Sequence, residues 1–142
     1  MNVVQEALGY LEQKYKRGIK FETPEAAADY FRVKLGLLEH ESFQCAFLDN
    51  RHALISCEEM FKGTINGCSV HPREIVKRAL SLNAAAVIIA HNHPSGVPDP
   101  SNADQAITTR LKDALNLVDI RLLDHFVVGG SEYVSFSEQG LI

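Results

Sequence analysis

The chain has 142 residues, 46% of them hydrophobic and 23% charged, with 14 Lys and Arg against 18 Asp and Glu for a net charge of −4. This size and composition predict a single domain of ordinary globular type. The acidic balance argues against direct nucleic-acid binding. The longest apolar run, residues 84–90, is too short to span a bilayer, and the polar amino terminus does not resemble a secretory signal. We therefore expect a cytoplasmic protein without membrane contact.

The sequence contains three cysteines. Cys45, Cys57 and Cys68 are odd in number and lack C-x-x-C spacing, so neither a disulfide framework nor a cysteine-rich zinc site is expected. We interpret them as free thiols in or near strands.

The first half of the chain predicts two helices and a hairpin. Apolar residues at helical spacing favour a helix over about 3–16. Thr23, followed by proline and an acid, is typical of a helix start, and this second helix should run to Leu35 and end at Gly36. Two short β-prone segments, 42–49 and 52–57, flank Asn50-Arg51 and read as a hairpin.

The second half alternates helices and strands. A third strand is plausible at 63–70, and Pro72 should open a helix over 73–82. The unbroken apolar run at 85–91 favours a strand that is buried on both faces. After a Pro- and Gly-rich loop, a helix should begin at Ser101, and strands should follow at 120–128 and 132–136. This order predicts an α/β or α+β sandwich, with helices packed on a mixed or mostly antiparallel sheet.

The most informative motif lies in this second half and reads H-x-H, seven residues, S-x-x-D: His91, His93, Ser101 and Asp104. Side chains alternate along a strand, so His91 and His93 should project to one side while Asn92 faces away. Asp104 would reach the same place from the first turn of the next helix. Two imidazoles and a carboxylate form a three-ligand set for a divalent metal and leave a coordination position open for water.

Each half of the motif also has a simpler interpretation. The two histidines could be ordinary loop residues. Ser101 followed by Asp104 is also the pattern of a capping box, which occurs where no metal is near. Capping and metal binding are compatible, and the Ser101 hydroxyl could either cap the helix or stabilise an oxyanion.

A metal-bound water also needs a proton acceptor, usually a carboxylate. Spacing alone does not choose among five upstream acids, each of which could simply be a solvated surface residue: Glu39, Glu41, Glu58, Glu59 and Glu74.

The run HNHPSG, followed by VPDP and SNAD, resembles the metal motif of the JAMM (MPN+, JAB) superfamily, and more closely that of its RadC family. The surrounding segments agree over nearly all of residues 23–142, so we divide the chain into an N-terminal helix at 1–22 and a RadC-like JAB/MPN domain at 23–142. The resemblance implies a cytidine-deaminase-like α/β sandwich. The longer family members carry an amino-terminal helix-hairpin-helix region that this sequence does not show.

The resemblance also implies roles. His91, His93 and Asp104 would be the ligands of Zn²⁺, Ser101 would assist the bound water or the oxyanion, and Glu41 would be the general acid/base. The implied function is a zinc-dependent metallopeptidase or isopeptidase acting on a peptide or protein, in a family that carries a DNA-repair label. The alternative is a non-catalytic, zinc-containing binding module associated with repair or replication.

Nucleobase deamination is disfavoured because the chain has neither H-x-E nor C-x-x-C. Asp124-His125 interrupts an apolar strand. We interpret it as a buried, hydrogen-bonded polar pair. The alternative is that His125 supports a metal ligand or faces the substrate.

Overall fold

The computed structural model describes residues 2–14, 20–63 and 70–142. Within that part of the chain the helices are α1 (Val3–Lys14), α2 (Pro24–Leu35), α3 (Pro72–Ser81) and α4 (Asn102–Asn116). The strands are β1 (Ser42–Leu48), β2 (Leu54–Lys62), β3 (Ala86–Asn92), β4 (Arg121–Gly129) and β5 (Glu132–Ser135). No described helix is both long and apolar enough to cross a membrane.

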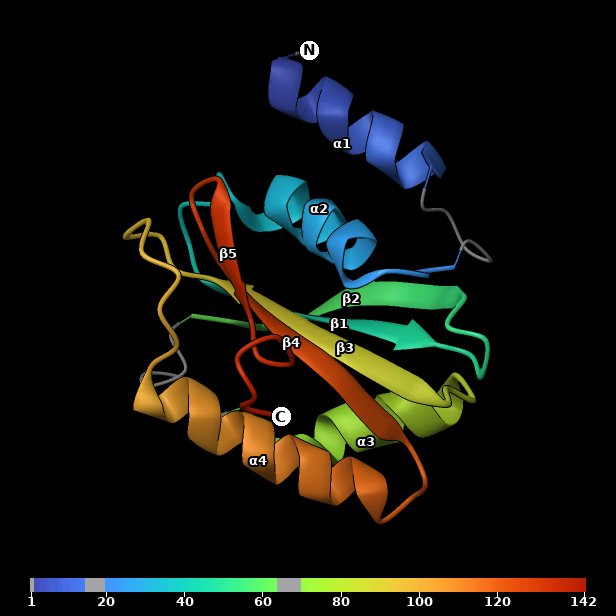
Figure 1. Cartoon of the computed structure of the whole chain (residues 1–142). Coiled ribbons are helices and arrows are strands. Elements are labelled where there is room, and N and C mark those ends of the chain that lie inside the picture. The colour runs from blue at the N-terminus through green and yellow to red at the C-terminus, as the bar shows by residue number, and fades with distance from the viewer. Residues whose placement is uncertain (1, 15–19, 64–69) are drawn as a thin grey trace.

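The strands form one mixed sheet in the order β2-β1-β3-β4-β5. The central pair β3 and β4 is parallel, and the other neighbours are antiparallel. The two faces of the sheet are covered by different helices: α2 lies on one face with α1 beyond it, and α3 and α4 lie on the other (Figure 1). This arrangement confirms the predicted α/β sandwich.

The core is divided between these two faces. One cluster packs α2 against the sheet around Phe31, Leu35 and Phe126. The other packs α3 and α4 around Phe47, Ile75 and Leu111. All seven residues of β3 are buried, as expected for a strand covered on both faces.

Helix starts follow the predicted signals. The Thr23 hydroxyl accepts a hydrogen bond from the backbone N–H of Ala26 at 3.1 Å, and proline stands at the first position of both α2 and α3. The α2 helix does end at Gly36, but not through a left-handed residue, since Gly36 has φ −61°. Glycine is needed there because a Cβ atom would lie 2.7 Å from the Gly130 carbonyl oxygen.

Strand boundaries differ more from the prediction. The second hairpin strand continues five residues beyond Cys57, because β2 pairs with β1 over its whole length, to the register Ser42↔Lys62. The predicted strand at 63–70 and the thiol of Cys68 lie almost wholly in the segment 64–69, outside the described residues. The predicted last residues of the first helix, 15 and 16, also lie outside them.

Candidate metal centre

The two histidines of the H-x-H motif lie at the carboxyl end of β3 and project to the same side. The chain stays extended past the strand, because the backbone N–H of His93 donates to the Val128 carbonyl of β4 at 2.8 Å. The two Nε2 atoms, of His91 and His93, lie 3.1 Å apart. Asn92 between them points to the opposite side, as predicted.

Asp104 comes to this pair from the first turn of α4. Its Oδ1 lies 3.0 Å from Nε2 of His91, and its Oδ2 lies 3.2 Å from Nε2 of His93. The carboxylate is 1% exposed, so it is almost fully removed from solvent. The structure therefore brings together all three side chains that the sequence analysis nominated as ligands, and they form a group able to hold a metal ion.

Ser101 and Asp104 also form a capping box. The Ser101 hydroxyl accepts from the backbone N–H of Asp104 at 3.0 Å, and Asp104 Oδ2 accepts from the backbone N–H of Ser101 at 2.8 Å. The capping interpretation of this pattern is thus confirmed, and the same carboxylate faces the histidines. The cap holds the carboxylate in place at the helix start.

The loop between His93 and Ser101 is positioned by a close approach of its backbone to β4. A Cβ atom on Gly129, at the end of β4, would lie 2.7 Å from the Pro98 nitrogen and 2.8 Å from the Gly96 carbonyl. Only glycine lets the loop after His93 pack this tightly on β4. Sequence reasoning did not single out this residue.

The hydrogen bonds of the His91 and His93 rings determine which nitrogen atom of each ring faces Asp104. Nδ1 of His93 lies 2.9 Å from the Val97 carbonyl oxygen, which can only accept, so this nitrogen carries a hydrogen. Nδ1 of His91 lies 2.8 Å from Nε2 of His125. With both rings held through Nδ1, their Nε2 atoms meet beside the Asp104 carboxylate. When the rings are neutral with hydrogen on Nδ1, three acceptors converge, an arrangement that requires a cation.

A proton on His93 can supply positive charge at this point. The hydrogen bond with Asp104 raises the pKa of His93, against the opposing effect of burial, and the nearby Glu41 carboxylate acts in the same sense as Asp104. Burial alone would raise the pKa of Asp104, but hydrogen bonds from His91 and His93 hold it far below its usual range. The carboxylate is therefore ionised at any pH at which the protein would work.

The five upstream acids have different surroundings. Glu41 is partly buried, immediately before β1, and is the one whose charge reaches His93. Glu39 is exposed. Glu58 forms a two-bond ion pair with Arg78, both bonds at 2.8 Å.

The other two acids also have partners. Glu59 accepts hydrogen bonds from Ser42 and His40. Glu74 lies in the first turn of α3, 3.9 Å from Arg73. Of the candidate acids, Glu41 is thus the one that is partly buried, acts on His93 through its charge and forms no ion pair with any described residue.

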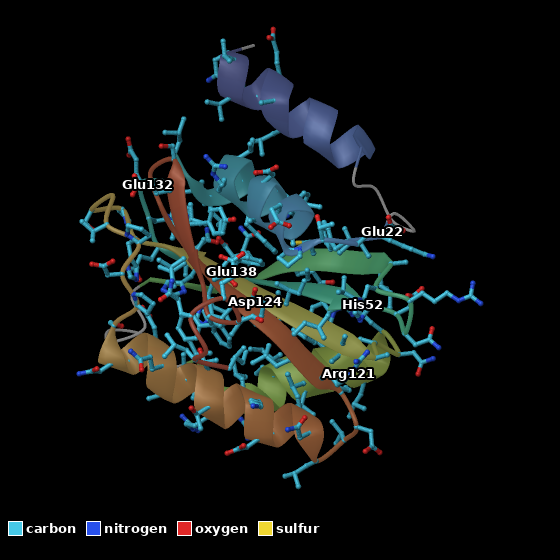
Figure 2. All side chains as sticks on the ribbon, viewed as in Figure 1. Glu22, His52, Arg121, Asp124, Glu132 and Glu138 are labelled. Carbon is cyan, nitrogen blue, oxygen red and sulfur yellow. The ribbon has the colours of Figure 1, made fainter. Side chains whose placement is uncertain are left out.

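Asp124 and His125 are both buried and hydrogen-bonded. Their side chains do not bond each other, but the backbone N–H of His125 donates to Oδ1 of Asp124 at 2.7 Å. Asp124, labelled on β4 in Figure 2, accepts from the Ser135 hydroxyl at 2.6 Å and from the backbone N–H of Ser137 at 2.9 Å. These bonds tie β4 to the end of β5 and to the segment that follows it. His125 faces His91 instead. Each residue is buried and hydrogen-bonded, which confirms the preferred interpretation. The contact between His125 and His91, which the alternative role of His125 requires, is also present.

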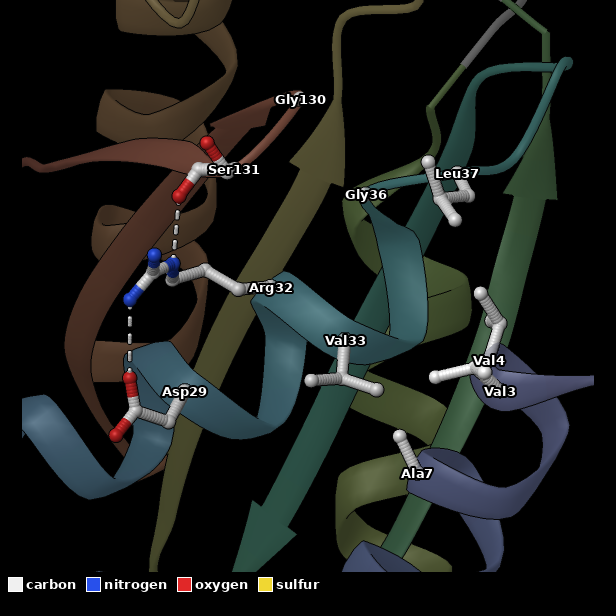
Figure 3. A pocket seen from close by; sticks show the side chains of 10 residues that line it. All are labelled: Val3, Val4, Ala7, Asp29, Arg32, Val33, Gly36, Leu37, Gly130 and Ser131. Atoms are coloured by element: carbon white, nitrogen blue, oxygen red, sulfur yellow. Dashed lines mark hydrogen bonds and ion pairs between the residues drawn. The ribbon is translucent and has the colours of Figure 1, made fainter.

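A separate apolar cavity of about 550 Å³ lies between α1, α2 and the turn that joins β4 to β5 (Figure 3). Val3, Val33 and Leu37 contribute to its wall, and Arg32 at its edge bonds Asp29 and the Ser131 carbonyl. None of the lining residues is a candidate ligand, so this cavity is distinct from the metal centre.

Comparison with known proteins decides the family. The RadC-like JAB domain model matches residues 21–141, which contain the whole triad. The chain belongs to the RadC family. A UPF0758 protein of Vibrio cholerae is 59% identical over 138 residues, covering 97% of this chain and 87% of the relative.

Two further members of the RadC family are longer. UPF0758 proteins of Nitrosococcus oceani and Leptothrix cholodnii are 56% and 57% identical over 133 and 122 residues. These alignments cover 94% and 86% of this chain but 59% and 55% of the relatives. The chain thus spans little more than half the length of those two proteins.

Proposed function

We propose that this RadC-family domain is a zinc-dependent hydrolase that cleaves an amide or isopeptide bond in a peptide or protein. The observation that carries the proposal is the convergence of His91, His93 and Asp104, whose polar atoms lie 3.0–3.2 Å apart at the carboxyl end of the central strand β3. The site is not sealed, because the His93 side chain is 17% exposed while the other two are nearly buried.

The donor set and its spacing suit zinc. Ligand atoms at 2.0–2.1 Å from one tetrahedral zinc ion lie about 3.3–3.4 Å from one another, close to the separations in this triad. Two imidazoles with one carboxylate are ligands that zinc accepts readily. Three protein ligands leave one position for water, as in catalytic rather than structural zinc sites.

The chemistry divides between the ion and the protein. A bound zinc ion would polarise the scissile carbonyl and lower the pKa of a water molecule in the open position. The Glu41 carboxylate would accept the proton of the attacking water and deliver it to the leaving nitrogen. The Ser101 hydroxyl accepts one hydrogen bond in the cap but keeps its own hydrogen, which it would donate to the developing oxyanion.

Metal analysis tests the proposal. Protein purified without chelators, or reconstituted after chelation, should carry one zinc ion per chain, and His91→Ala should lose it. His71→Ala is the matched control, because His71 is an exposed histidine at the start of α3. Wild-type protein that takes up no stoichiometric zinc would contradict the proposal.

A second measurement separates the enzyme from the binding module. Zinc-loaded protein should hydrolyse members of a library of peptides and lysine-linked isopeptides, chelation should stop the reaction, and added zinc should restore it. Zinc-loaded protein that cleaves nothing in such a library would instead support the non-catalytic alternative.

A further inference from the structure

His91 and the two buried side chains behind it, His125 and Thr108, form a continuous hydrogen-bonded chain that ends on the backbone of Asp104. Thr108 Oγ1 lies 2.7 Å from the Asp104 backbone carbonyl oxygen and 2.6 Å from Nδ1 of His125. Nε2 of His125 lies 2.8 Å from Nδ1 of His91. Thr108, His125 and His91 are 2%, 0% and 1% exposed, so solvent does not interrupt the chain.

The direction of these bonds follows from the donors available. A threonine hydroxyl carries one hydrogen, and the Asp104 carbonyl can only accept, so Thr108 donates there. Toward His125 the same hydroxyl must accept, which places a hydrogen on Nδ1 of that ring. Neutral His125 then has a bare Nε2, which can only accept from Nδ1–H of His91. The remaining nitrogen of a neutral His91 is left with a lone pair.

We propose that Thr108 and His125 are positioning residues that fix His91 in the tautomer whose Nε2 faces the metal. The Thr108 hydroxyl orients His125, and His125 orients His91. The inference rests on the proposed function, since it assumes that the triad binds zinc. The His93 ring needs no such device, because its Nδ1 donates directly to the Val97 carbonyl.

The surroundings of the His125 ring leave its two nitrogens no other hydrogen-bonding partner in the described part of the chain. Its ring stacks on Phe136 with centroids 4.4 Å apart and meets Phe43 edge-on at 6.1 Å. Hydrocarbon on both sides restricts the ring to its two polar contacts, with Thr108 and His91. This packing holds the imidazole in place, as is usual for groups that orient metal ligands.

Thr108→Val tests the proposal with little change of shape. Without the hydroxyl, His125 is free to move its hydrogen to Nε2, where it would oppose Nδ1–H of His91. The zinc dissociation constant, measured by competition with a chromophoric chelator, should rise about tenfold or more. Thr108→Ser should restore it. The matched control is Thr109→Val, since Thr109 makes the same bond to the carbonyl four residues earlier but is exposed.

A direct readout requires no substitution. In ¹⁵N-histidine spectra of the wild-type protein at about pH 8.5, well above the ordinary histidine pKa, His125 should carry its hydrogen on Nδ1. A hydrogen on Nε2 of His125 would overturn the inference, as would equal zinc affinity in Thr108→Val and Thr109→Val. Wild-type protein that binds no zinc would instead overturn the proposed function, so the two failures are distinguishable.

Discussion

The side-chain carbonyl of Asn92 accepts a 2.8 Å hydrogen bond from the backbone N–H of Ser42, fifty residues earlier in the chain. Its amide nitrogen donates to the backbone carbonyls of His40 and Leu38 at 3.0 and 3.4 Å. Asn92 stands between the two candidate histidine ligands but faces the other way. It therefore ties the segment that carries Glu41 to the strand that carries the histidines.

Replacing this residue should loosen that segment. Asn92→Ala leaves the buried N–H of Ser42 without its acceptor, so we expect the free energy of unfolding to fall by about 1–3 kcal/mol. Amide hydrogen exchange at residues 38–42 should accelerate while zinc binding persists. Asn116→Ala, at an exposed asparagine in the last turn of α4, should change neither quantity. Unchanged amide hydrogen exchange at residues 38–42 in Asn92→Ala would show that the hydrogen bonds of Asn92 do not hold this segment in place.

The capping box predicts a graded effect at Ser101. Ser101→Ala removes the acceptor for the Asp104 N–H and should lower the free energy of unfolding by about 1 kcal/mol. Ser101→Asn should recover most of this loss, because asparagine is a good capping residue. Chemical denaturation measures both variants. Equal stability of Ala and Asn at this position would mean that the cap contributes nothing.

The pairing of His93 with Asp104 predicts how the stability of the metal-free protein depends on pH. Since folding raises the pKa of His93 above its unfolded value near 6.5, the pair stabilises in full below about pH 6.5 and loses this contribution as pH rises through the folded pKa. Burial lowers the pKa of His125. This shift destabilises the folded protein only at more acidic pH, so it does not alter the trend above pH 6.5. Relative to Asp104→Asn, chelated wild-type protein should therefore lose stability as pH rises from 6.5 to 9.

Saturating zinc should reverse this dependence of stability on pH. Protons compete with the ion for the imidazoles, so stabilisation by saturating zinc should grow over the same pH range. Denaturant unfolding at several pH values, with chelator and with zinc, gives both slopes. Slopes of the same sign would argue against a shared site for protons and metal.

Glu41 and Glu39 provide a matched pair for the proton-transfer step. Once a cleaved peptide has been identified, Glu41→Gln should lower turnover by about 10²–10⁴-fold at unchanged zinc content. Glu39→Gln, two residues away and exposed, should behave like the wild type. A Glu41→Gln variant with full turnover would remove this residue from the mechanism.

Local signals predicted the elements best. Thr23-Pro24, Pro72 and Ser101 mark helix starts because each satisfies or removes a backbone donor within a few residues. The end of β2 was missed because its last residues, interrupted by Glu58 and Glu59, gain their strand conformation from pairing with β1. Strand length there depends on the neighbour rather than on the segment itself.

The same difference between local and distant contacts holds for the candidate metal centre. Spacing within one motif predicted that His91, His93 and Asp104 converge, because a strand end and a helix start fix their directions. The partners behind them come from distant segments, and sequence alone could not choose them. Thr108 is the partial exception, since it follows Asp104 by one helical turn and shares its face of α4. That spacing was the available signal, and it was not used.

The candidate ligands His91, His93 and Asp104 belong to neither of the two apolar clusters that stabilise the fold. Chelation should therefore leave an intact scaffold rather than an unfolded chain. If the domain binds zinc as proposed, it would release the ion when zinc is scarce and bind it again later without a refolding step.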